Sequence, residues 1–134
     1  MYLLDTNACI RILNDSSTTL VTQLQQHKPS DIFLCSVVKA ELVYGAYHSA
    51  HQAENLRILE KFFEPFISLP FDDLCSLVYG RIRSDLARNG TLIGPNDLMI
   101  ASIAICNKLT LITANTKEFG RVPGLSLENW ENPK

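Results

Sequence analysis

Short apolar runs alternate along this chain with longer stretches that mix apolar and polar residues at helical spacing. Four runs, at residues 2–5, 32–35, 66–69 and 110–113, have the length and composition of buried strands. A weaker run at 125–127 is compatible with an edge strand. Because a helical stretch separates each of the four strands from the next, the pattern predicts an α/β fold with a parallel sheet of four to five strands, flanked by helices on both faces.

The helical stretches have recognisable ends. Ser36 is expected to cap the helix that contains Glu41, because a hydroxyl at this position accepts a free backbone N–H. Asn89 and Gly90 form a typical helix C-terminus. The predicted helices span residues 7–13, 18–27, 36–45, 51–63, 72–88 and 97–108.

Length and composition indicate one globular domain over residues 1–134. The chain is 46% hydrophobic and 19% charged, and a chain of this length buries about two thirds of the surface that its unfolded form exposes. No apolar run approaches the ~20 residues of a membrane span and no basic leader is present, so we expect a cytoplasmic protein. Four single cysteines lack the paired spacing of a zinc site, and we expect reduced, buried thiols.

Three acidic residues stand where such a fold builds binding sites. Asp5 ends the first strand, and open parallel sheets bind ligands beyond the carboxyl ends of their strands. Glu41 lies on the helix after the second strand, and Asp97 begins the most apolar helix. Each has a simpler explanation, since Asp5 and Asp97 suit helix N-termini and Glu41 suits a narrow solvent-facing stripe. Their joint placement favours one shared pocket.

Carboxylates gathered in one pocket repel one another unless a cation neutralises them. Oxygen ligands without a Cys or His cluster favour Mg²⁺ or Mn²⁺. Such an ion, with the water that it activates, suits hydrolysis of a phosphodiester. The net charge of −2 argues against a protein that coats nucleic acid through its overall field, but it is compatible with an RNA substrate.

Four segments together resemble the PIN-domain ribonucleases, specifically the VapC toxins of bacterial toxin–antitoxin pairs. They are LLDTN at 3–7, AELVYGA at 40–46, IGPNDLMIA at 93–101 and LITANTKEF at 111–119. The resemblance covers nearly the whole chain. It implies an α/β/α sandwich and a metal-dependent endoribonuclease that binds Mg²⁺ or Mn²⁺ and cuts RNA, often a tRNA or a ribosomal RNA loop.

The resemblance also implies four catalytic acids and three supporting polar residues. The acids are Asp5, Glu41, Asp97 and Glu118, of which the first three are expected to bind the metal, and the supporting residues are Asn7, Thr113 and Asn115. Many PIN domains have Asp where this chain has Asn115. Asn115 and Glu118 are therefore alternatives for the fourth ligand, Glu118 has a second interpretation as a surface charge, and the number of ions stays open.

The resemblance further implies partners for this chain: a second copy in a homodimer, and a cognate VapB-like antitoxin whose C-terminal segment lies across the catalytic groove and holds the toxin inactive. An acidic pocket attracts an antitoxin Arg, because a guanidinium is a fixed bidentate counter-charge. Tyr44, Tyr47, Phe62 and Phe63 either line an interface or, as their helical spacing favours, join the core. For the RNA backbone we expect contacts from Lys39, Arg83, Arg88 and Lys117.

Two other classes of function stay open from the residues alone. A catalytically weak PIN-fold module that binds RNA or protein is favoured by one feature, the uncharged Asn115. A small-molecule phosphatase or signalling domain also has acids at strand ends. That class would need an acid pair after the first strand, and Asp5, Thr6 and Asn7 supply none.

Overall fold

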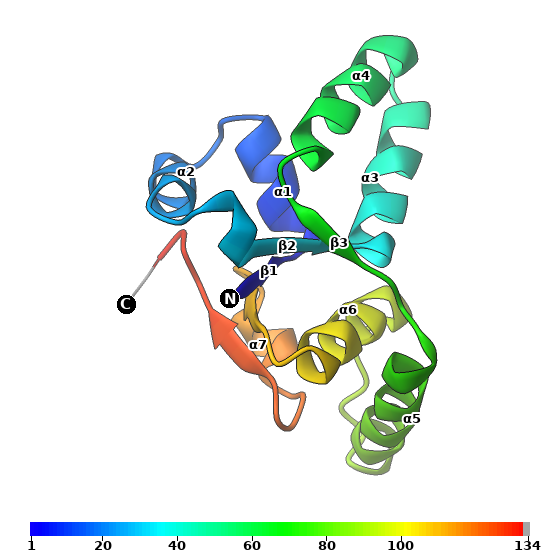
Figure 1. Ribbon diagram of the computed structural model, residues 1–134. Coiled ribbons are helices and arrows are strands. Elements are labelled where there is room, and N and C mark those ends of the chain that lie inside the picture. Colours follow the sequence, from blue (N-terminus) through cyan, green and yellow to red (C-terminus); the bar gives the residue numbers. More distant parts are fainter. Residues whose placement is uncertain (133–134) are drawn as a thin grey trace.

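A five-stranded parallel sheet lies between two groups of helices in the computed structural model, which describes residues 1–132 (Figure 1). The strand order is β3-β2-β1-β4-β5 and every neighbouring pair is parallel. This arrangement confirms the predicted α/β/α sandwich, including the edge strand near the C-terminus. The strands are β1 (Tyr2–Leu4), β2 (Ile32–Cys35), β3 (Ile67–Leu69), β4 (Thr110–Ile112) and β5 (Ser126–Glu128).

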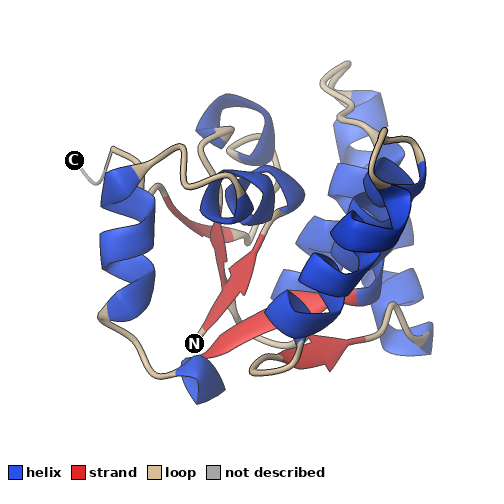
Figure 2. Cartoon of the chain, turned by 90° about the horizontal axis from the view of Figure 1, so that it is seen from above, coloured by secondary structure: helices blue, strands red, loops and turns tan. Residues whose placement is uncertain are grey.

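The helices cover both faces of the sheet. In Figure 1, α1 to α4 lie above the strands and α5 and α6 lie below them, and Figure 2 shows the same strands from above with the helices gathered around them. The helices are α1 (Thr6–Leu13), α2 (Thr18–Gln25), α3 (Ser36–Tyr47), α4 (Gln52–Phe63), α5 (Asp73–Arg88), α6 (Pro95–Cys106) and α7 (Thr116–Phe119). Within residues 1–132, no helix has the length and apolar character needed to cross a bilayer.

The fold differs from the sequence prediction at the starts of α3 and α6, and it contains one additional helix. Ser36 is not the N-cap of α3, because β2 runs directly into the helix and Cys35 occupies the cap position without a side-chain hydrogen bond. The Ser36 hydroxyl instead donates to the Leu69 carbonyl at 3.3 Å and ties α3 to β3. Helix α6 begins at Pro95, a residue suited to a first helical turn, rather than at Asp97. The short α7 was not predicted.

Strand β1 is the central strand of the sheet, and successive strands are added first on one side of it and then on the other. The connections from β1 to β2 and β3 run one way, and β4 and β5 then pair on the other side of β1. Ligand sites in open α/β sheets form at such a reversal, beyond the carboxyl ends of the strands. Here the reversal lies between Leu4 and Ile112, the last residues of β1 and β4, which are both buried in the core.

Candidate active site

Asp5 leaves β1 at this reversal and begins α1. Its backbone N–H donates to the Ile112 carbonyl at 3.1 Å, and its carboxylate accepts the Ala8 N–H at 2.8 Å as the N-cap of α1. The residue is only 4% exposed. Burial raises the pKa of Asp5, whereas hydrogen bonds from the Thr113 side chain and the Ala8 N–H lower it. The capping explanation of Asp5 is therefore correct, and the cap also holds the carboxylate toward the other acids.

Glu41 is fixed by two residues from other elements. On the second turn of α3, its carboxylate accepts the Thr6 hydroxyl at 2.5 Å and the Asn96 side-chain amide at 3.3 Å. These hydrogen bonds join α3 to the first turns of α1 and α6. Sequence reasoning overlooked Thr6 and Asn96, although both lie directly beside predicted acids. Glu41 therefore has a defined orientation, and it does not extend freely into solvent as a surface charge would.

At Asp97, burial and neighbouring negative charges act together. It lies in the first turn of α6 and is half-buried. Burial raises its pKa from 3.8 to about 6, with further contributions from the charges of Glu41, Glu118 and Asp5, in that order. Glu118, on α7, is held by the Asn115 side-chain amide, which donates to it at 2.8 Å. Four acids from four elements thus act on one another electrostatically.

A pocket of about 210 Å³ lies among these groups. It is lined by Asp5, Thr6, Asn7, Glu41, Asp97, Asn115 and Phe119. Thr113 is buried beneath it and accepts the Asn115 backbone N–H at 3.0 Å. The structure therefore brings together the four acids and the three supporting residues that the sequence predicts for the site.

The donor set of this pocket fits a hard divalent cation. The ion pairs within residues 1–132 join Arg11 to Glu131 and Arg88 to Asp85, so in this part of the chain no Lys or Arg neutralises the four acids. No three of the four acids have oxygens within 4.8 Å of one another among the described residues. Mg²⁺ retains several waters, so acids at this spacing would reach it partly through its bound water.

The four basic residues expected to contact RNA lie outside this pocket. Lys39 extends over the Phe63 ring, 4.7 Å from its centroid, and Arg83 donates to the Tyr79 hydroxyl at 2.8 Å. Arg88 pairs with Asp85 at the end of α5. Lys117 is exposed on α7, next in sequence to Glu118. Lys117 is thus the cation most directly attached to the candidate site.

Comparison with known proteins identifies the family. The PIN-domain model matches residues 2–125. Ribonuclease VapC2 of Rickettsia felis is 39% identical over 132 residues, which are 98% of this chain and 98% of that protein. The chain belongs to the VapC family of PIN-domain ribonucleases. The tRNA(fMet)-specific endonuclease VapC of Salmonella typhimurium is 35% identical over 129 residues, covering 96% of this chain and 97% of that protein.

Solved VapC-family structures have the same fold over the same length. The crystal structure of DNA-bound VapBC from Salmonella typhimurium superposes with a TM-score of 0.91 at 34% identity, covering 96% of this chain and 97% of that chain. VapBC2 from Rickettsia felis, bound to a promoter DNA fragment, gives a TM-score of 0.90 at 39% identity, covering 96% and 98%. The family resemblance drawn from four short segments is therefore confirmed.

One further residue of this VapC-family chain affects the site from outside the predicted set. Glu131 lies close enough to Asp5 for its charge to raise the pKa of Asp5. Its carboxylate pairs with the Arg11 guanidinium at 3.3 Å, which ties the C-terminal segment to α1. The sequence carries no local signal for this pair, because the two residues lie at opposite ends of the chain.

Proposed function

We propose that this protein is a metal-dependent endoribonuclease, the toxin of a toxin–antitoxin pair, that hydrolyses RNA phosphodiester bonds. The observation that carries the proposal is the convergence of Asp5, Glu41, Asp97 and Glu118 at the reversal of strand order, with no protein cation paired to them among the described residues. Burial raises the pKa of Asp97 most, and the charges of Glu41, Glu118 and Asp5 raise it further, as expected where acids gather without a counter-charge. A bound cation would relieve it.

Asp5, Glu41 and Asp97 would hold Mg²⁺ or Mn²⁺, with Glu118 as the fourth acid. When bound, the ion would polarise the scissile phosphate and activate water for in-line attack. The chain's own residues fix the geometry. Thr6 and Asn96 orient Glu41, the Ala8 N–H and Thr113 orient Asp5, and Asn115 orients Glu118. Loss of a supporting hydrogen bond of this kind typically lowers metal affinity or activity about 10–100-fold.

We infer that the substrate is a tRNA. The relative from Salmonella typhimurium, which aligns with 96% of this chain, is named a tRNA(fMet)-specific endonuclease. An initiator tRNA is therefore the first substrate to offer, with ribosomal RNA as the comparison. We place this activity in the cytoplasm, where both RNAs occur. Lys117 and the three other basic residues would hold the RNA backbone, so their single Ala variants should bind RNA more weakly at low salt.

The deciding experiment is cleavage of purified total RNA and of initiator tRNA by the isolated protein, with Mg²⁺ or Mn²⁺ against EDTA. Asp5→Asn and Asp97→Asn are made in parallel, and Asp15→Asn on the exposed turn after α1 is the matched control. Asn preserves the N-cap at residue 5, so a loss of cleavage reports charge rather than folding. We expect discrete metal-dependent fragments that disappear in both site variants. RNA binding without cleavage in any metal would instead support the binding-module alternative.

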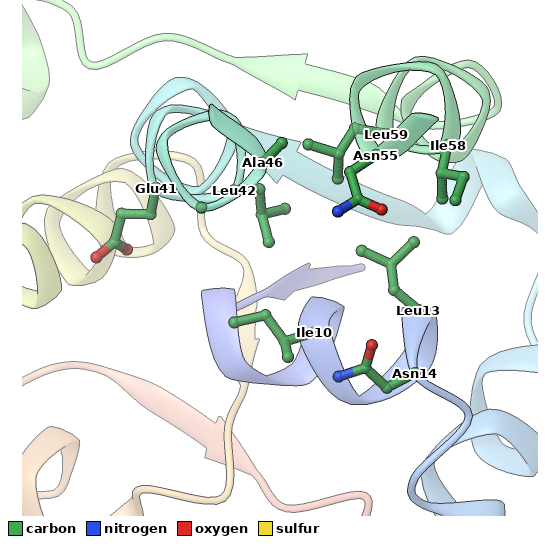
Figure 3. Close-up of a pocket in the computed structure, with 10 residues that line it drawn as sticks. Ile10, Leu13, Asn14, Glu41, Leu42, Ala46, Asn55, Ile58 and Leu59 are labelled. Carbon is green, nitrogen blue, oxygen red and sulfur yellow. The ribbon is translucent and has the colours of Figure 1, made fainter. Parts of the chain in front are cut away.

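We also propose that a cognate antitoxin and a second copy of the chain are partners. Solved structures of relatives include VapBC and FitAB complexes. Beside Glu41, a pocket of about 310 Å³ opens between α1, α3 and α4, and Figure 3 shows Ile10, Leu13, Leu42 and Ile58 around it. An apolar antitoxin segment seated there would bring an Arg within reach of the acids.

Exposed side chains beside this groove support its role as a docking surface. Tyr44 and Tyr47 are 67% and 57% exposed, so the expectation that they join the core is wrong: they lie on a face of α3 that the described residues leave open. Phe62 and Phe63 are half-buried against the core, as expected. Ile58→Asp should abolish co-purification with the co-expressed antitoxin, whereas Leu77→Asp, an exposed position on α5, should leave it unchanged. Equal retention by both variants would contradict this groove.

A further inference from the structure

A second group of metal-ligating side chains lies between α5 and α6. One ligand atom from each of Asp72, Cys75 and Cys106 lies within 4.8 Å of the other two. Asp72 is the N-cap of α5, Cys75 is in the first turn of that helix, and Cys106 is the last residue of α6. Spacing along the chain predicted no zinc site, and the fold brings two of the four single cysteines together.

We propose that Asp72, Cys75 and Cys106 bind a thiophilic divalent cation of the Zn²⁺ type. Two thiolates and one carboxylate are three of the four ligands that tetrahedral Zn²⁺ takes, and water supplies the fourth. Zn–S bonds of about 2.3 Å and Zn–O bonds of about 2.1 Å place tetrahedral ligand atoms about 3.5–3.8 Å apart. The three ligand atoms lie no more than 4.8 Å apart, so a contraction of at most about 1 Å brings them to this spacing.

The three side chains are suited to receive an ion from solvent. One Asp72 carboxylate oxygen, Oδ1, accepts the Cys75 N–H at 3.0 Å, which fixes the side chain and leaves Oδ2 as a ligand atom. Asp72 is exposed and Cys106 is half-buried, so the site opens outward, while Cys75 is fully buried at its base. Cys75 contacts the Pro70 carbonyl only weakly, with 3.9 Å between sulfur and oxygen. The donors thus already face one another.

This site is distinct from the acid pocket. Asp97 is in the first turn of α6 and Cys106 ends the helix, and nine residues of α-helix span about 14 Å. The ligands also differ in kind, because thiolates select soft ions and the oxygen-only pocket selects hard ones. An ion here would fasten the start of α5 to the end of α6, two helices that lie side by side in Figure 1. Its role would be to stabilise the helix that carries Asp97.

The test is a Co²⁺ titration of the reduced, full-length protein with Mg²⁺ present in excess. Cobalt bound to thiolate absorbs strongly in the near ultraviolet, whereas cobalt bound to oxygen ligands does not. We expect one equivalent of this absorption, displaced by Zn²⁺, and a Zn²⁺-dependent rise in melting temperature. Cys75→Ser and Cys106→Ser should each remove a ligand and abolish this absorption. Asp72→Asn preserves the helix cap and should weaken Co²⁺ binding about tenfold.

Two controls separate this site from the rest of the protein. Cys9→Ala removes a buried thiol on α1 and should leave the absorption unchanged, as should Asp5→Asn in the acid pocket. Circular dichroism verifies that each variant is folded, and the half-buried Cys106 is the position where Ser is most easily accommodated. Absence of the thiolate band in the wild-type protein, or its persistence in folded Cys106→Ser, would overturn the proposal. Neither result depends on ribonuclease activity.

Discussion

Replacing Asp97 by Asn should stabilise the metal-free protein while abolishing RNA cleavage. The pKa of Asp97 rises from 3.8 to about 6, and a full shift of this size corresponds to about 3 kcal/mol. Because the side chain is half-buried, solvent screening reduces this to about 1.5 kcal/mol. The N-terminus of α6 favours the charge by about 0.5 kcal/mol. The expected net gain of Asp97→Asn is therefore about 1 kcal/mol.

The gain depends on pH in a direction that the raised pKa determines. Below the unfolded pKa of 3.8, Asp97 is protonated in both the folded and the unfolded chain, so its charge costs nothing. As the pH rises from 3.8 through about 6, the unfolded chain ionises first and the folded state loses stability. Above that window the penalty is constant. Asn never ionises, so its advantage is small at pH 4 and complete at pH 8.

Urea unfolding in EDTA at pH 4 and pH 8 measures this difference. With a slope of about 2 kcal/mol/M for a chain of this size, a gain of about 1 kcal/mol moves the midpoint by about 0.5 M. Asp15→Asn is the control, because Asp15 has a positive φ of 51° that Asn adopts equally well. Adding Mn²⁺ should stabilise the wild type more than Asp97→Asn. A variant that is less stable than the wild type at pH 8, or whose gain is equal at both pH values, would refute the reasoning.

Three further substitutions test the fourth acid and the residues that position the acids. Thr6→Val removes the donor to Glu41 and should lower the cleavage rate about tenfold at unchanged stability, whereas Thr6→Ser should retain the wild-type rate. Glu118→Gln should weaken Mn²⁺ binding several-fold by titration, and unchanged affinity would assign the fourth position to Asn115. Gly120→Ala places a Cβ 2.5 Å from the Thr116 carbonyl oxygen, so it should displace α7 and lower both the cleavage rate and the melting temperature.

The sheet and the convergence of the acids follow from regularities that a single sequence displays. Apolar runs separated by helical stretches predict parallel strands, and parallel strands end at one edge of a sheet, so Asp5 and the residues after β4 had to lie together. The segments that carry Glu41 and Asp97 begin at the same edge. By contrast, α7 has four residues, too few for a periodic pattern, so hydrophobic spacing does not predict it.

The contacts between side chains from distant segments could not be predicted in this way. Thr6 and Asn96 meet at Glu41 because α1, α3 and α6 begin around one pocket, and no sequence spacing encodes that meeting. The same holds for Cys75 and Cys106, which lie far apart in the sequence but close together in the fold. The residue type of Ser36 predicts a helix cap, but β2 runs directly into α3, and the Ser36 hydroxyl donates to the Leu69 carbonyl instead.

Asp5 shows why a structural and a chemical explanation of one residue need not compete. An N-cap must accept a backbone N–H. This hydrogen bond holds one carboxylate oxygen of Asp5 2.8 Å from the Ala8 nitrogen and so fixes the orientation of the carboxylate. A metal ligand needs the same fixity, and in the proposed site the second carboxylate oxygen would be the donor atom. Asn at this position satisfies the cap but carries no charge. The helix start therefore positions the acid, and the charge alone distinguishes a functional residue from a capping one.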